Sequence, residues 1–277
     1  MAIELCRKGF KDVSISTKAL YDLPSWRAGG FFDPGTGEET TLPLQLRTRR
    51  ALETFHVFHQ IEHGNHPYLL SNVVRRLPLY SMAHSKTGVE VLEKFNYMPP
   101  RQLVTIDFGN GIVHENYAKY ITYFIDVAQV MKQLWTEVKK LKIPVIIEEI
   151  CSFEQCTQDI ICNCAGLAGG TLAQDELVYT QRGHFFLLNT EAGDAHMNYM
   201  LFTKVPQGEK DEYLYVFPKN SVHTAEYPDG RACSGMLGGT FIVDSDTLSK
   251  EELQKLDETE FQKLQERAQE FFYGKDL

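Results

Sequence analysis

The chain has 277 residues, of which 43% are hydrophobic and 12% aromatic, so it can bury a large core and is not disordered. Its 28 Lys and Arg stand against 37 Asp and Glu, and the formal charge of -9 argues against a general nucleic-acid binder. No apolar run reaches the ~20 residues that cross a bilayer, and the N-terminus has no apolar stretch suited to a secretion signal. We therefore expect a cytoplasmic protein outside the membrane, whose partner is a small-molecule substrate or another protein, with a homo-oligomer as one possible state.

The first hundred residues contain three stretches with helical patterns. Residues 46–62 place apolar side chains at helical spacing, and Gly64, Asn65 and Pro67 are stop signals for that helix. Residues 68–76 form a second helical candidate, and residues 86–95 form a third that ends before two prolines.

The middle of the chain has the pattern of a βαβ unit. Residues 103–108 form an apolar, β-branched run that predicts a strand. Residues 116–141 carry apolar side chains at spacings of three and four, which predicts one long helix, and residues 144–149 predict a second strand. Two such strands joined by a helix are expected to be parallel.

The last third changes character, from helical patterns to short strands with polar turns. Residues 184–188, 199–205, 213–217 and 240–243 predict an antiparallel meander. Ser249 and Glu252 form a capping box for a final amphipathic helix that ends at Gly274. The whole is a mixed α+β protein: a βαβ-like central unit, a meander and a C-terminal helix. A domain boundary falls most naturally between an N-terminal region, 1–151, and a C-terminal region, 152–277, although one domain is the alternative.

Four of the nine histidines lie close together in the sequence. If the helix of residues 46–62 continues past its stop signals, they project within a sector of about 80° because each helical residue turns by roughly 100°. Two imidazoles one turn apart can bind one zinc ion. The stripe is therefore a candidate metal site, with a polar or pH-responsive helix face as the alternative. Its members are His56, His59, His63 and His66.

Four of the six cysteines form a second cluster: Cys151, Cys156, Cys162 and Cys164. Four thiolates are a common zinc ligand set, but the spacing here is irregular. The apolar residues between them favour the alternative, in which cysteines pack as small hydrophobic side chains.

Two further places carry candidate catalytic groups. Asp107 ends the first predicted strand of the central unit, at the edge where open α/β sheets bind ligands, although turn capping is the commoner role of such carboxylates. The second is the loop from Tyr227 to Gly235, in which Cys233 is a candidate nucleophile and His223, just upstream, its candidate base. This loop resembles the active-site loop of bacterial ubiquitin-conjugating (E2-like) proteins, which implies a thioester or thioether intermediate on Cys233. The alternative is a turn at Pro228, Asp229 and Gly230 with an incidental thiol.

Three functions follow from these candidates. The leading hypothesis is a zinc-dependent, hydrolase-like enzyme in which the histidines bind the metal and Asp107 is the general base for a metal-bound water. The second is a thiol-centred E2-like transferase that uses Cys233. The third is a structural or assembly protein without catalysis, in which any metal serves stability.

Overall fold

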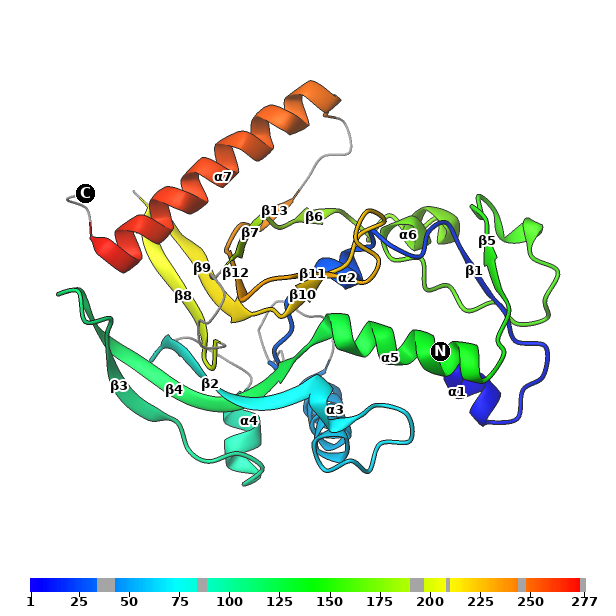
Figure 1. The fold of residues 1–277 in the computed structure, drawn as a ribbon, viewed down its shortest axis with the longest axis horizontal. Helices are drawn as coiled ribbons and strands as arrows, with labels where there is room; N and C mark the ends of the chain where they lie inside the picture. The colour runs from blue at the N-terminus through cyan, green and yellow to red at the C-terminus, as the bar shows by residue number, and fades with distance from the viewer. Residues whose placement is uncertain (34–42, 84–88, 190–196, 208–209, 244–247, 275–277) are drawn as a thin grey trace.

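The computed structural model describes residues 1–277 except for 34–42, 84–88, 190–196, 208–209, 244–247 and 275–277. Its centre is a sheet of seven strands in the order β3-β4-β2-β8-β9-β12-β7 (Figure 1). Neighbouring strands are antiparallel except β2 and β8, which are parallel. The strands are β2 (Val74–Met82), β3 (Gln102–Asp107), β4 (Val113–Ile125), β7 (Phe185–Leu188), β8 (Met200–Gln207), β9 (Lys210–Pro218) and β12 (Gly235–Gly238).

The long helix α7 (Lys250–Tyr273) packs on one face of this sheet. Leu264 and Phe271 are buried against strand residues such as Leu214. These strand residues share one face of the sheet because β-strands alternate their side chains between the two faces. The side chain of Arg267 is also buried there, and it donates to the carbonyls of Tyr213 and Gly239 while it forms an ion pair with Glu212. The helix is therefore fixed to the sheet by apolar contacts and by one buried guanidinium.

The opposite face is covered by α3 (Leu44–Glu62), α4 (Val89–Lys94) and the segment around Phe31 and Phe32. Aromatic rings dominate this core. Phe32 lies edge-on to Phe58, and Phe55 lies 5.6 Å from Tyr123 between ring centroids. Aromatic burial of this kind contributes much of the hydrophobic stabilisation of a domain.

A second, smaller unit lies beside the sheet, and we call it the parallel-strand lobe. It consists of α1 (Ala2–Arg7), β1 (Ile15–Thr17), β5 (Val145–Ile147), the 3-10 turn η2 (Phe153–Gln155), α6 (Leu167–Ala173) and the chain around them. Strands β1 and β5 are parallel, and a small core of Ile3, Val138 and Ile143 joins them to α1 and to α5 (Val127–Lys140). Helix α5 leads from the sheet into this lobe (Figure 1).

Shorter elements connect these units. They are α2 (Pro24–Arg27), the 3-10 turn η1 (Ser71–Val73), the hairpin-like pair β10 (Ser221–Val222) and β11 (Arg231–Ala232), and the pair β6 (Gln181–Arg182) and β13 (Ile242–Val243). None of the described helices is long and apolar enough to cross a membrane.

The α+β class, the antiparallel meander and the C-terminal helix are confirmed. The capping box of Ser249 and Glu252 forms as expected, and the helix ends before Gly274. The predicted helix of residues 46–62 is α3. The expected helix of residues 86–95 is α4 over its described part, since residues 86–88 lie outside the described residues. The division at residues 151 and 152 stays a prediction.

The central unit differs from the sequence expectation in its detail. Residues 116–125 belong to strand β4, so the expected long helix begins only at Val127 as α5. Strand β5 pairs in parallel with β1 and not with β3. Residues 68–76, expected as a helix, contain η1 and the start of β2. In β4 most residues from Tyr117 to Phe124 are buried on both faces of the sheet, which removes the alternation that marks a strand.

Candidate functional site

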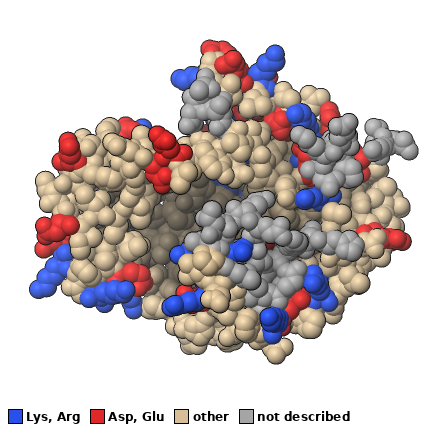
Figure 2. Space-filling view, turned by 180° about the vertical axis from the view of Figure 1, so that it is seen from behind, with Lys and Arg blue, Asp and Glu red and all other residues tan. Residues whose placement is uncertain are grey.

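The space-filling view shows a hollow between the parallel-strand lobe and the body that holds the sheet (Figure 2). Helices α2 and α5 lie at the junction of these two parts (Figure 1). Side chains from four distant segments meet at this junction, four of them buried and that of Cys233 half-buried, and we call them the Lys219 cluster: Trp26, Asp126, Lys219, His223 and Cys233.

Lys219 is the central member of the cluster. It directly follows β9, and only 5% of its surface is exposed. Its ammonium donates to the carbonyl of Ala28 at 2.9 Å and to that of Trp26 at 3.5 Å. Burial lowers the pKa of Lys219, and the charges of Cys233 and Asp126 oppose that shift. Lysine is rarely buried without a carboxylate partner, so this side chain is the most unusual in the junction.

The segment that supplies those two carbonyls passes unusually close to the sheet. A Cβ atom at Gly29 would lie 2.6 Å from the sulfur of Met236, so a larger residue at this position would require the Met236 side chain to move. The indole N–H of Trp26 donates to the carbonyl of Leu20 at 2.8 Å, and this hydrogen bond fixes the orientation of the Trp26 ring in α2. The backbone around Lys219 is thus held in place from both sides.

Asp126 joins the cluster to α5. Its side chain caps the helix by accepting from the N–H of Gln129, and its second oxygen accepts from the amide of Asn220 at 2.5 Å. The carboxylate is 5% exposed, so it contributes a nearly buried negative charge beside Lys219. The sequence contains a signal for helix capping, since Asp126 directly precedes the helical repeat of α5. The signal was missed because the expected helix of residues 116–141 placed Asp126 in its interior.

His223 is completely buried against Trp26, with ring centroids 5.0 Å apart. Its Nδ1 lies 2.8 Å from the carbonyl oxygen of Pro228, which can only accept, so Nδ1 carries the proton. Its Nε2 lies 3.2 Å from the hydroxyl of Ser221. Gly230 adopts a φ of +99° and leaves no room for a Cβ beside this ring. The hydrogen-bonding groups of His223 therefore contact its own segment, at Ser221 and Pro228, and the ring stabilises the loop that follows it.

The thiol of Cys233 donates to the carbonyl of Lys219 at 3.2 Å. Burial raises the pKa of Cys233 above its ordinary value, whereas a nucleophilic cysteine needs a lowered one. The thiolate required for an E2-like thioester step is disfavoured at this position.

The four histidines of the stripe do not converge. His56 lies beside Gln60 and the rings of His59 and His63 stack at 4.1 Å, but α3 ends at Glu62. His66 lies beyond the helix, where its Nδ1 accepts from the backbone N–H groups of residues 68 and 69. Burial is the largest cause of a lowered pKa at His59, followed by the neighbouring His63.

The cysteine cluster and Asp107 also stay apart. Cys151, Cys162 and Cys164 are exposed, Cys156 is half-buried, and all four are free thiols. Asp107 is exposed at the end of β3, where its carboxylate accepts from the N–H of Gly109 at 2.7 Å and closes a turn. Among the described residues, which include all eight candidate ligands, no group of three or more His, Cys, Asp or Glu could hold a metal ion.

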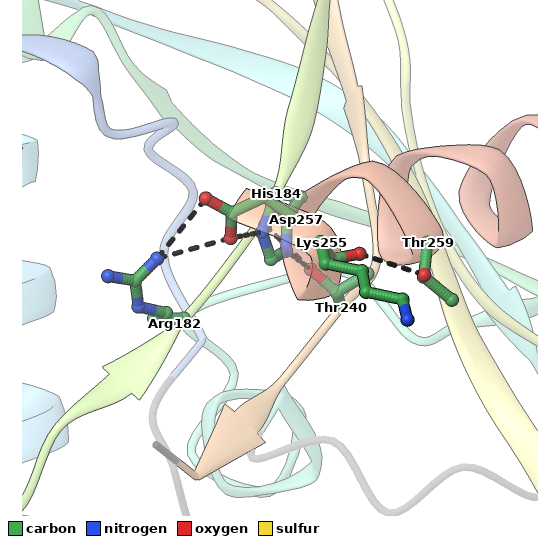
Figure 3. Close-up of polar contacts among 6 residues, drawn as sticks. All are labelled: Arg182, His184, Thr240, Lys255, Asp257 and Thr259. Carbon is green, nitrogen blue, oxygen red and sulfur yellow. Dashed lines mark hydrogen bonds and ion pairs between the residues drawn. The ribbon is translucent and has the colours of Figure 1, made fainter. Parts of the chain in front are cut away.

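A second polar network lies between the meander and α7 (Figure 3). His184 is nearly buried, and its Nε2 lies 2.8 Å from the carboxylate of Asp257, which Arg182 also contacts. Its Nδ1 lies 2.9 Å from the hydroxyl of Thr240, which also accepts from the backbone N–H of His184. The order hydroxyl, imidazole, carboxylate is that of a catalytic triad, but Thr240 is only 3% exposed, so the network holds α7 in place.

Comparisons with known proteins find likeness at the level of structure only. No family model and no curated protein sequence matches the chain. Iminodiacetate oxidase from Chelativorans sp. BNC1 has a similar structure, with a TM-score of 0.53 and 10% identity, over 93% of this chain and 73% of that one. L-proline dehydrogenase from P. horikoshii matches with a TM-score of 0.50 and 13% identity, over 95% of this chain and 72% of that one. At such identities the likeness shows the fold alone.

These findings correct the sequence-based functional hypotheses. The zinc-dependent hydrolase is wrong, because its histidine and cysteine ligands do not converge in the described structure and the structural neighbours are an oxidase and a dehydrogenase. Zinc as a cofactor is wrong for the same reasons. The raised pKa of Cys233 argues against the E2-like transferase, and the non-catalytic assembly protein stays a hypothesis.

Proposed function

We propose that this chain takes part in the oxidation of a small secondary amine that carries a carboxylate on the carbon next to nitrogen. The observation that carries the proposal is the fold shared with iminodiacetate oxidase and L-proline dehydrogenase, because the substrates in both names have this chemistry. A buried lysine with a lowered pKa, Lys219, also lies in the described structure, and such a side chain is a candidate base for this kind of reaction.

The reaction removes two electrons and two protons, one from a carbon and one from nitrogen, and leaves an imine. Protein side chains do not accept an electron pair of this kind, so an acceptor such as a flavin is required. Proteins commonly hold dinucleotides with a glycine-rich turn between a parallel strand and a helix, where backbone N–H groups bind the phosphates.

The described residues do not fit that phosphate-binding turn. Strand β1 is followed by residues 18–23, which contain no glycine, and then by the four-residue helix α2. Strand β5 is followed by residues 148–165, which also contain no glycine. We therefore assign the described residues no part in holding the flavin phosphates.

The test supplies the acceptor from outside. The purified chain is incubated with excess FAD, a reducible dye and either iminodiacetate or L-proline. We expect dye reduction that depends on the amine. Glutarate is the matched control, because it replaces the N–H of iminodiacetate with a methylene group and must give no reduction. Dye reduction with neither amine above the glutarate level would contradict the proposal.

A further inference from the structure

The segment between β5 and α6 carries four of the chain's six cysteines, and the proposed function uses none of them. Cys151, Cys162 and Cys164 are exposed and Cys156 is half-buried, and all four are free thiols. The two remaining cysteines of the chain, Cys6 and Cys233, are half-buried, so its exposed thiols all lie in this segment. Thiol–disulfide exchange requires a sulfur that a dissolved disulfide can reach, and these thiols meet that requirement.

Cys162 and Cys164 are separated by one residue, so the chain itself keeps them close. A step of two residues spans at most about 7 Å between Cα atoms. Disulfides join residues whose Cα atoms are about 4.4–6.8 Å apart. The pair therefore stays within bridging range unless the segment is fully extended. Cys151 and Cys156 lack this constraint, because the 3-10 turn η2 lies between them.

Asn163 bends the segment between the two thiols and attaches it to α6. Its Oδ1 accepts from the N–H of Ala165 at 3.3 Å, which is an Asx turn. Its Nδ2 donates to the carbonyl of Gly169 at 2.9 Å. A Cβ atom at Gly169 would lie 2.7 Å from Oδ1 of Asn163, so the glycine permits this close approach. The Asn163 side chain is directed to the helix, while both flanking cysteines are exposed.

We propose that Cys162 and Cys164 form a thiol–disulfide exchange site that reduces small-molecule disulfides. The thiolate of one cysteine attacks a sulfur of the dissolved disulfide, forms a mixed disulfide and releases one thiolate. The thiolate of the other cysteine then attacks the protein sulfur and releases the second thiolate. Two electrons pass from the protein to the dissolved disulfide, and the two protons lost by the cysteines are taken up by the two product thiols. This inference does not depend on the proposed function.

Two physical arguments define how this site behaves. A thiol tethered two residues away closes the bridge faster than a dissolved thiol attacks the mixed disulfide, so the bridged form is the product. The bridge closes a ring over a single intervening residue and lies at the surface, and strained or exposed disulfides are more easily reduced than structural ones. We therefore expect reduced glutathione to open the bridge again.

The test uses the purified full chain, with glutathione disulfide as the probe. The reduced protein is incubated with an excess of the probe and quenched with acid, and the remaining thiols are blocked with N-ethylmaleimide. Cleavage before aspartate separates the cysteines, because residues 159–174 contain Cys162 and Cys164 and residues 126–158 contain Cys151 and Cys156. By mass spectrometry we expect peptide 159–174 to lose two hydrogens and to carry neither glutathione nor the blocking group. Excess reduced glutathione must restore both thiols.

Two variants test the pairing. Cys162→Ser leaves Cys164 without its neighbour, and we expect glutathione to stay attached to Cys164. Cys151→Ser is the matched control, because it removes an exposed thiol from the same segment and must leave the bridge between Cys162 and Cys164 intact.

Three results would overturn the inference. The first is glutathione or the blocking group retained on both Cys162 and Cys164 of the wild type. The second is a bridge from either of them to Cys151 or Cys156. The third is a bridge that reduced glutathione does not open, because that is the behaviour of a permanent structural disulfide.

Discussion

The seven-stranded sheet and the parallel-strand lobe bury their apolar side chains to very different extents. In the sheet, Leu214 and Leu201 are 0% and 2% exposed, and α7 covers them. In the lobe, Ile147 and Leu177 are 58% and 86% exposed. Since hydrophobic stabilisation scales with the apolar area removed from water, the free energy of folding must come mainly from the sheet and its helices. The lobe is the part in which substitutions are tolerated and local opening is least costly.

The sharpest way to break this comparison is to remove the same kind of side chain from each region. Leu264→Ala empties a completely buried site between α7 and the sheet, and we expect a loss of about 2–5 kcal/mol in the free energy of unfolding. Ile160→Ala in the lobe is the matched control, because Ile160 is 62% exposed and its truncation should change stability by less than about 0.5 kcal/mol. Urea denaturation followed by circular dichroism measures both. Similar losses at the two sites would show that the lobe folds as part of the same core.

The next largest effect is expected at the buried guanidinium of α7. Arg267→Met keeps much of the side-chain volume but leaves the carbonyls of Tyr213 and Gly239 without their donor. Each unsatisfied buried acceptor costs roughly 1–3 kcal/mol, so we expect a loss of about 3 kcal/mol. Lys263→Met on the same helix removes a half-exposed ion pair with Glu260 and should cost no more than about 0.5 kcal/mol. Equal effects would mean that α7 is held by its charges in general and not by Arg267.

The sequence predicted the C-terminal helix better than the strands and their pairing, for a physical reason. Capping of the last helix depends on Ser249 and Glu252 alone, and local chemistry of this kind is visible in any sequence. Strand β4 was mistaken for a helix because its central residues are buried on both faces, and Tyr117, Tyr120 and Phe124 happen to recur at helical spacing. The pairing of β5 with β1 joins residues far apart in the chain, which no local pattern specifies.

The candidate site was less predictable still. The side-chain chemistry of His223 and Cys233 makes them candidates in the sequence, but their hydrogen bonds go to the surrounding loop and backbone. Lys219 gave no signal, because a lysine after a strand is ordinarily a solvated turn residue. Its burial depends on a segment far away in the sequence, because the carbonyl of Ala28 accepts from its ammonium. The histidine stripe failed for a local reason, since the helix ends at Glu62 and His66 lies in the following turn.

The smallest effects are expected where the meander meets α7, and they sharpen the comparison within the sheet region itself. Thr240→Val leaves the backbone N–H of His184 without an acceptor in a buried place, so it should cost about 1–2 kcal/mol. Asp257→Asn keeps an oxygen for the Nε2 of His184 and loses an ion pair with Arg182 that is about one-third exposed, so about 0.5 kcal/mol is expected.

Because both substitutions act through one imidazole, their effects should not be additive. Once Thr240 no longer fixes the ring of His184, less remains to be lost at Asp257, and the double variant should be more stable than the sum of the single losses implies. Chemical denaturation of the four proteins at pH 8 measures this coupling. Strict additivity would show that His184 does not link the two groups, and that α7 is held at its N-terminal half by the contact of Phe261 with the ring of Phe186 instead.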